Sequence, residues 1–486
     1  MRQSVKNAGL VGIGALSGIL LSITFSADAN KGGAVNLPYD ELRIFADVFS
    51  RIKQDYVEPV NDKKLMREAI QGMVSGLDPH SMFLDEEGFK ELQVSTQGQF
   101  GGLGIEVSAE DGLVKVIAPI EDTPAFHAGI RSGDFITKVD GKAVRGLSLN
   151  DAVKLMRGEP NTKVTLTVYR KGENQPLTFK LERAIIHVQS VKGKMLEPGY
   201  AWVRISQFQE NTLDLLSKKL SEFNTKTPLK GLVIDLRDDP GGLLNAAVGV
   251  SAAFLPKDSL VVYTDGRLAN SKMRLFARPE FYANSHNDDP IRKLGTAFHS
   301  TPIVVLVNGG SASASEIVSG ALQDHKRAKV FGTPTFGKAS VQTIIPLSNS
   351  NTAIKLTTAR YFTPNGRSIQ AKGIVPDTII EQETMDGTGT PARLKEADLL
   401  HHLENKVEGD NEVSEKPDTD IKAAISDQDK PSKETDLLPR KKPLEYGGAD
   451  DYQLKQALNQ LKGLPVVPRS PAVTPAAAPA TSDKGK

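Results

Sequence analysis

Residues 308–317 read Asn-Gly-Gly-Ser-Ala-Ser-Ala-Ser-Glu-Ile and follow the apolar run Ile-Val-Val-Leu-Val at 303–307. An apolar run that stops at Asn-Gly-Gly is typical of a buried strand, and residues 316–322 continue with helical spacing. Ser313 therefore lies at a strand-to-helix turn. The first N–H groups of a helix lack partners and lie at the positive end of its dipole, so they can stabilise an anion forming beside the hydroxyl. The pattern indicates a nucleophilic serine that still needs a base.

A structural role is the simpler interpretation of the same turn. Ser313 and Glu316 match a capping box, in which the serine hydroxyl accepts a main-chain N–H and the glutamate reaches back. The tetrapeptide alone does not separate a cap from a nucleophile.

Lys338 shifts the balance towards catalysis. It alternates with Ser340 and Gln342, and the two-residue period of a strand places all three on one face. A lysine accepts the serine proton only if burial lowers its pKa to roughly 7–8, and apolar neighbours such as Phe336 and Ile344 could impose this. Gln342 would then orient the neutral amine. The alternative is that Lys338 is a solvated surface lysine.

Nucleotide binding is a further alternative, because residues 332–338 match the first seven positions of a phosphate-binding P-loop. The next residue should be Ser or Thr to hold magnesium, and it is Ala339. The loop should also open a helix, whereas residues 340–345 are typical of a strand. Both departures disfavour a nucleotide site.

A Ser-His-Asp triad would need His325, the nearest histidine after Ser313. That histidine lies about 18 Å along the same helix, at 1.5 Å per residue. It fits a favourable cation at the end of the helix better than a catalytic base.

Several motifs resemble those of the carboxy-terminal processing (tail-specific) proteases, which are Ser/Lys endopeptidases. The matching stretches are 235–244, 311–317, 321–324, 327–328, 335–338, 341–342 and 361–370. The resemblance covers about residues 38–382, with Asp239 where many relatives have Asn. It implies that Ser313 is the nucleophile, Lys338 the general base and Gln342 the residue that positions the base, with no metal and no cofactor.

The composition is that of an ordinary globular protein. The length of 486 residues predicts about two to four domains and is ample for a large core. Charged residues make up 24% of the chain and hydrophobic residues 39%. A net charge of +1 argues against nucleic acid as the partner. The absence of cysteine excludes disulfides, thiol chemistry and Cys-ligated zinc.

The chain begins with the charged, apolar and small-residue parts of an export signal at residues 1–29. Its apolar run, at 8–25, is at the border of spanning length, so the alternative is an uncleaved anchor in the inner membrane. Either way, we expect the remaining chain in the periplasm.

Residues 30–97 form a helical N-terminal region with two amphipathic patterns. The first places five apolar residues on one face: Leu42, Phe45, Phe49, Ile52 and Tyr56. The resemblance implies that this region pairs subunits, so we expect a homo-oligomer.

Residues 98–184 resemble a PDZ domain. The loop residues Gly101, Gly102, Leu103, Gly104 and Ile105 would offer N–H groups to the terminal carboxylate of a peptide, while the next strand adds the peptide to the sheet. The helix at 148–156 would form the other wall of the groove. Protein substrates bound by their C-termini are therefore the expected partners, with an adaptor protein as a further one.

Residues 185–382 alternate strands and helices, which predicts an α/β protease core with a mixed sheet. The expected strands are 200–205, 231–236, 302–307, 328–331, 341–346 and 353–358, and the expected helices are 211–223, 243–254 and 314–326. Sites in such folds gather at the carboxyl ends of strands. The N–H groups of Gly241 and Gly242 are one candidate oxyanion donor and that of Ala314 the other; the alternative for the glycines is a plain tight turn.

The remaining chain differs in composition. Residues 383–448 read as a low-complexity linker with few apolar residues. Residues 449–464 predict a short helix that must dock on its own body or on another subunit, and residues 465–486 a disordered tail.

The sequence therefore predicts a periplasmic PDZ-containing serine endopeptidase. The non-enzymatic alternative is a PDZ scaffold on an inactive protease body.

Overall fold

The computed structural model describes residues 37–110, 112–120, 122–173, 175–225, 228–283, 289–347, 351–381, 394–405 and 445–468. The chain divides into two compact units, one ending at Ile70 and one beginning at Gln71. The predicted export signal at 1–29 lies outside the described residues, as do most of the 383–448 linker and of the 465–486 tail. Among the described residues, no helix combines the length and apolar character needed to span a membrane.

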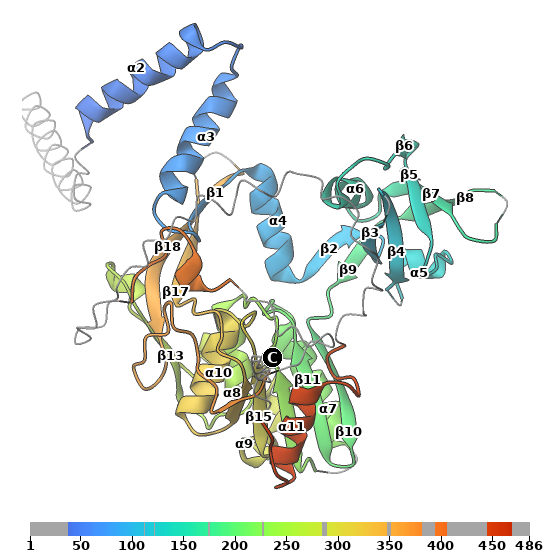
Figure 1. The fold of residues 1–486 in the computed structure, drawn as a ribbon, viewed down its shortest axis with the longest axis vertical. Coiled ribbons are helices and arrows are strands. Elements are labelled where there is room, and N and C mark those ends of the chain that lie inside the picture. Colours follow the sequence, from blue (N-terminus) through green and yellow to red (C-terminus); the bar gives the residue numbers. More distant parts are fainter. Residues whose placement is uncertain are drawn as a thin grey trace, which may run out of the picture. The chain divides into compact units, whose positions relative to one another are not determined.

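A six-stranded mixed sheet forms the centre of the second unit (Figure 1). Its strands, in spatial order, are β10 (Val191–Glu197), β11 (Tyr200–Ile205), β12 (Gly231–Asp235), β15 (Ile303–Val307), β16 (Lys329–Gly332) and β19 (Thr378–Ile379). The pair β10–β11 is antiparallel, and every later pair is parallel. The predicted α/β core with a mixed sheet is confirmed.

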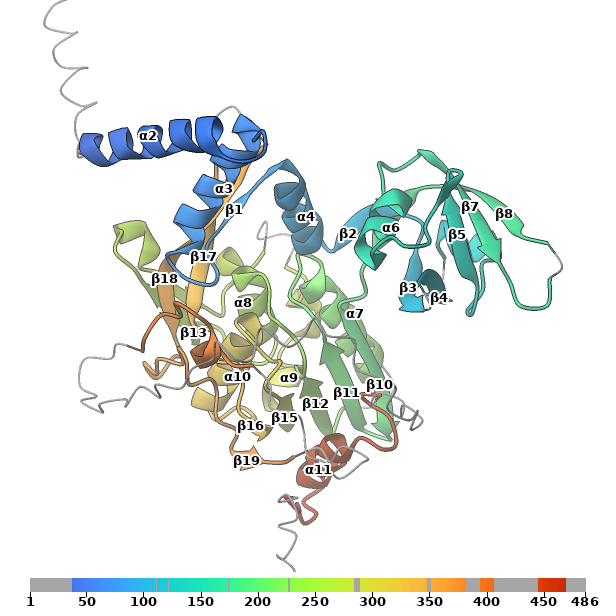
Figure 2. The same cartoon turned by 45° about the horizontal axis from the view of Figure 1, so that its top comes forward.

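Both faces of this sheet are buried, because successive side chains of a strand point to opposite sides. Ile303, Val305 and Val307 pack in the larger core, with the helices α7 (Thr212–Asn224), α8 (Leu244–Ala252) and α10 (Ala314–Asp324). Val304 and Leu306 face the opposite side, where they pack with Leu454 and Ala457 of α11 (Tyr452–Leu461). The C-terminal helix therefore docks on the six-stranded sheet of its own chain (Figure 2).

A second sheet carries the strand that follows Lys338. It orders β1 (Met82–Leu84), β18 (Ala353–Phe362), β13 (Leu260–Asp265) and β14 (Arg274–Phe276), and β17 (Ser340–Pro346) also pairs with β18. Strand β18 runs four residues beyond the predicted end at 358, because its later residues pair with β13. Helix α10 ends two residues before the predicted end at 326, where Lys326 adopts a left-handed φ of 53°.

Residues 105–182 form a separate antiparallel sheet of β3 (Ile105–Glu110), β4 (Leu113–Pro119), β5 (Phe135–Val139), β7 (Lys163–Tyr169) and β8 (Leu177–Glu182), with β6 (Lys142–Ala143) beside β5. It carries the helices α5 (Pro124–His127) and α6 (Leu149–Met156) and has its own core. The strands β2 (Gln99–Gly102) and β9 (Ala184–His187) pair with each other where the chain enters and leaves this domain.

The remaining elements are short or N-terminal. Helix α4 (Glu86–Gln97), α9 (Ala297–Ser300) and the 3₁₀ turns η1 (Ala269–Ser271), η2 (Pro279–Phe281), η3 (Arg292–Leu294) and η4 (Glu396–Asp398) belong to the second unit. Helix α2 (Tyr39–Asp55) belongs to the first, and α3 (Asp62–Ser75) crosses the division. No residue of α2 is buried, and the predicted apolar positions Leu42 and Phe45 are 47% and 43% exposed.

Candidate active site

Three loops meet at the carboxyl ends of β12, β15 and β16, which is where ligand sites gather in parallel sheets. The loop after β15 carries Ser313 immediately before α10, as the sequence predicts. Ser313 has a φ of 54°, a region that costs a residue with a side chain about 1–3 kcal/mol and is concentrated at functional sites. This conformation stops Ser313 from continuing the helix.

Ser313 and Glu316 form the predicted capping box at the start of α10. The N–H of Ser313 donates to Oε2 of Glu316 at 2.8 Å. In return, the N–H of Glu316 donates to the main-chain carbonyl of Ser313 at 2.9 Å.

The Glu316 carboxylate joins the serine and lysine loops. It is fully buried, and its Oε2 also accepts the N–H of Lys338 at 3.0 Å. Its Oε1 accepts the Gly337 N–H at 2.7 Å and the Thr335 hydroxyl at 2.6 Å. Burial raises the pKa of Glu316 to about 7, against the effect of these hydrogen bonds. The sequence showed Glu316 only as a cap; its long-range role had no local signal.

Lys338 lies in a desolvated environment that suits a base. Burial, followed by the nearby charge of Lys355, lowers the pKa of Lys338 to about 8. Its Nζ donates to Oε1 of Gln342 at 2.7 Å, and Nε2 of Gln342 donates to the Ser340 hydroxyl at 3.0 Å. The structure thus brings together the three side chains predicted to share a strand face.

Ser313 joins this group through the main chain. The Tyr361 hydroxyl donates to the carbonyl oxygen of Lys338 and also lies 3.1 Å from that of Ser313, so that its one proton is shared between the two. Among the described residues, no hydrogen bond links the Ser313 hydroxyl directly to the Lys338 amine. Tyr361 was inside a family motif but was not predicted as a site residue.

The predicted oxyanion donors lie beside the serine but differ in availability. A Cβ on Gly241 would lie 2.8 Å from the Ala314 nitrogen and 2.9 Å from the Ser313 Cβ, so glycine is required for this approach. The Gly241 N–H, however, donates to Oδ1 of Asp239 at 2.8 Å. Within the described chain, the N–H groups of Gly242 and Ala314 have no hydrogen-bond acceptor, which leaves these two available.

The two alternative sites are not formed. His325 contacts the main-chain carbonyl of Leu260 at 2.7 Å from the far end of α10, away from Ser313. The residues after Lys338 form β17 rather than a helix, so the loop has no helix N-terminus with which to hold phosphates.

The predicted carboxylate-binding loop divides between two elements. Gly101 and Gly102 belong to β2 and pair with Ile185 and Ala184 of β9, because the chain is still in the connecting ribbon there. Of the five predicted loop residues, only Leu103 and Gly104 therefore lie between strands, because Ile105 is the first residue of β3. Gly104 has a φ of 74°, and a Cβ there would lie 2.3 Å from Thr123. Strand β3 ends the sheet order, so its outer edge can accept a further strand.

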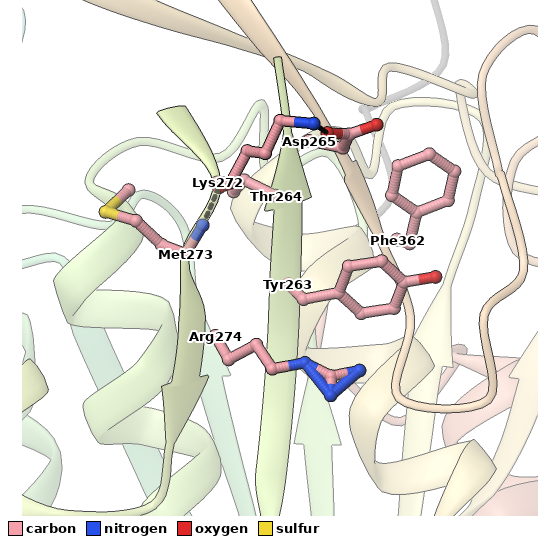
Figure 3. A pocket seen from close by; sticks show the side chains of 7 residues that line it. All are labelled: Tyr263, Thr264, Asp265, Lys272, Met273, Arg274 and Phe362. Atoms are coloured by element: carbon pink, nitrogen blue, oxygen red, sulfur yellow. Dashed lines mark hydrogen bonds and ion pairs between the residues drawn. The ribbon is translucent and has the colours of Figure 1, made fainter. Parts of the chain in front are cut away.

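A surface hollow lies apart from these residues. Figure 3 shows it at the β13–β14 edge, where Tyr263 lies between Phe362 and Arg274. None of the predicted catalytic residues lines it. The part of the chain that the structure describes also holds no cluster of three or more acidic or histidine side chains suited to a metal ion.

Three family models match the chain. They are Peptidase family S41 at residues 199–380, the PDZ domain at 101–181, and the activating protease CtpB N-terminal domain at 21–88.

Related proteins agree with these matches. The carboxy-terminal-processing protease of Bartonella bacilliformis is 47% identical over 376 residues, covering 76% of this chain and 82% of the relative. The carboxy-terminal processing protease CtpB of Bacillus subtilis is 34% identical over 354 residues, covering 72% and 69%. The solved photosystem II D1 C-terminal processing protease is 30% identical, with a TM-score of 0.39, and covers 69% of this chain and 92% of the solved one. The chain therefore belongs to the carboxy-terminal processing protease family and is a serine peptidase of family S41 with a PDZ domain.

Proposed function

We propose that this serine peptidase is an endopeptidase that works through a Ser313–Lys338 dyad. The observation that supports it most is the environment of Lys338. Its amine is desolvated and donates to Gln342, and its main-chain N–H shares the Glu316 carboxylate with the N–H of Ser313. A pKa of about 8 leaves a useful fraction of the amine neutral near physiological pH.

The chemistry follows the usual order of acyl transfer. Ser313 Oγ attacks the scissile carbonyl while neutral Lys338 accepts its proton and then returns it to the leaving amine. Water, deprotonated by Lys338, then hydrolyses the acyl-enzyme. The N–H groups of Ala314 and Gly242 are the donors that we assign to the oxyanion. This step requires the Lys338 amine to approach the Ser313 hydroxyl when substrate binds.

Cleavage of an unfolded protein, casein, tests the dyad. Ser313→Ala and Lys338→Ala should each reduce turnover at least about 100-fold without loss of the thermal unfolding transition. Near-normal turnover of Lys338→Ala would refute the base assignment. If instead the chain is a PDZ scaffold on an inactive body, the parent protein will not cleave casein. Labelling by a fluorophosphonate probe that is lost in Ser313→Ala would exclude this alternative.

We further propose that substrates are recognised by their C-termini at the PDZ domain. The open edge of β3 and the tight Leu103–Gly104 turn support this mode of binding. A labelled peptide with an apolar C-terminal residue should bind at least about tenfold more tightly than the same peptide with a C-terminal amide. Equal affinity would exclude carboxylate recognition.

The proposed setting is a periplasmic homo-oligomer. The exposed apolar residues of α2 support self-association through the N-terminal region. The sequence of residues 1–29 supports export, with an inner-membrane anchor as the alternative.

A further inference from the structure

A buried aspartate lies at the end of a hydrogen-bond chain that leads to Lys338. Asp78 is 4% exposed and follows α3 in the segment Leu-Asp-Pro-His-Ser at 77–81. Its Oδ1 accepts the N–H groups of His80 and Ser81, each at 2.9 Å, and its Oδ2 accepts the Ser81 hydroxyl at 2.6 Å. These bonds fix the carboxylate in one orientation.

The same carboxylate sets the direction of the next bond. The Thr357 hydroxyl lies 3.0 Å from Oδ1 of Asp78 and 3.0 Å from Nε2 of Gln342. The hydrogen-bonds of Asp78 favour its ionised form and lower its pKa, although burial opposes them, so the carboxylate can only accept. The single Thr357 proton therefore points to Asp78, and Thr357 must accept from Gln342.

This direction determines which end of the Gln342 amide faces the base. Nε2 of Gln342 donates one proton to Thr357 and the other to Ser340. Its Oε1 therefore faces the Lys338 amine, 2.7 Å away. A neutral amine that donates to Oε1 keeps its lone pair for another proton. If the amide were reversed, its N–H would donate to that lone pair and occupy the atom that must accept the serine proton.

We propose that Asp78 is a positioning residue for the catalytic base, acting through Thr357 and Gln342. The inference rests on the proposed role of Lys338 as the base. It adds the residue that orients Gln342, the hydrogen-bond partner of that base. Asp78 does not touch the reacting atoms. Its contribution is to hold the Thr357 proton, so that Thr357 can only accept from the Gln342 amide N–H and Oε1 is left for Lys338.

An electrostatic role for Asp78 predicts a different result. The charged groups that act on Lys338 are Lys355 of β18, Glu396 of η4, Glu316 of α10 and Asp78 itself. Removing the Asp78 charge alone would lower the pKa of Lys338 and move the acid limb of the rate profile to lower pH, with the plateau rate unchanged. Reversal of the amide instead lowers the plateau rate.

The test uses paired substitutions on adjacent residues of β18 in the full chain. Thr357→Val removes the relay hydroxyl, Thr357→Ser keeps it, and Thr358→Val is the matched control, because Thr358 bonds Thr343 at the exposed side of the same hairpin. With labelled casein, kcat of Thr357→Val and of Asp78→Asn should fall about tenfold or more across the pH plateau while KM changes little. Thr357→Ser and Thr358→Val should stay within about twofold of the parent.

The controls separate this inference from the proposed dyad. If Ser313→Ala and Lys338→Ala remain active, the dyad itself is wrong. If both are inactive but Thr357→Val keeps the parent kcat, only the positioning role is overturned. Should Asp78→Asn fail to fold, the comparison of Thr357→Val with Thr357→Ser still decides the question.

Discussion

The hydroxyl of Tyr361 lies 3.1 Å from the main-chain carbonyl oxygen of Ser313. The same hydroxyl donates to the carbonyl of Lys338, so one fully buried side chain fixes the two loops that carry the predicted dyad. The Ser313 carbonyl also accepts the N–H groups of Glu316 and Ile317. Among the described residues, the Lys338 carbonyl accepts a hydrogen bond from Tyr361 alone.

Tyr361→Phe should therefore lower both stability and turnover. The substitution leaves a buried carbonyl without its donor, which costs about 1–3 kcal/mol of unfolding free energy. It also releases Lys338 from its fixed position, so kcat should fall. Denaturant unfolding and casein turnover measure the two effects. Tyr263→Phe is the control, because the Tyr263 ring stacks on Phe362 and among the described residues its hydroxyl makes no hydrogen bond; equal behaviour of the two variants would contradict the role of Tyr361.

The rate of cleavage should depend on pH through Lys338. The protonated amine cannot accept the serine proton, so kcat should rise with pH up to about 8 and then level off. Lys338→Arg should be inactive at every pH, because a guanidinium stays protonated. The pH–rate profile between pH 6 and 10 measures this. A profile flat across that range would show that a group with another pKa limits the reaction.

Asp239 should make stability depend on pH in an unusual direction. It is fully buried, its Oδ2 has no hydrogen-bond partner among the described residues, and burial raises its pKa to about 8. The unfolded carboxyl titrates near 3.8, so the stability that Asp239 contributes in its protonated form is present below that pH and is lost as pH rises to about 8.

Asp239→Asn removes this titration while keeping the shape of the side chain. The unfolding free energy of the variant, minus that of the parent, should increase between pH 5 and pH 8.5. Denaturant unfolding at both values provides the measurement, with Asp265→Asn, at an exposed carboxylate paired with Lys272, as the control. A difference that does not change with pH would mean that Asp239 is ionised throughout.

The C-terminal helix should contribute to the stability of the protease core. Asp451 pairs with the buried guanidinium of Arg237 through both carboxylate oxygens, at 2.6 and 2.8 Å, and also caps α11 at Leu454. Asp451→Ala leaves the Arg237 guanidinium with Asp235 as its remaining carboxylate partner. The substitution should lower the free energy of unfolding by about 3 kcal/mol or more. Lys462→Ala breaks an exposed pair between the same helix and Glu197 and should cost at most about 1 kcal/mol. Similar losses in the two variants would contradict this assignment.

The sequence alone determined the elements whose cause is local. The apolar run at 303–307, the Asn-Gly-Gly stop and the helical spacing after Ser313 predicted β15, the turn and α10 in the right order. The alternation of Lys338, Ser340 and Gln342 predicted that the three side chains lie together, and they do. The strand period is not the reason, because Lys338 precedes β17 and a bulge separates Val341 from Gln342. Periodicity succeeds for β15 and α10 because side-chain direction in a strand or helix depends on neighbours a few residues away.

Only the tertiary structure decided how those residues are held. Glu316 reads as a helix cap in the sequence, yet its carboxylate bonds main-chain groups of Gly337 and Lys338 in another loop. Asp78 reaches Thr357 across 279 positions of the chain, and Asp451 reaches Arg237 across 214. Such contacts leave no spacing pattern, because they arise when buried polar groups from distant segments satisfy one another inside a packed core.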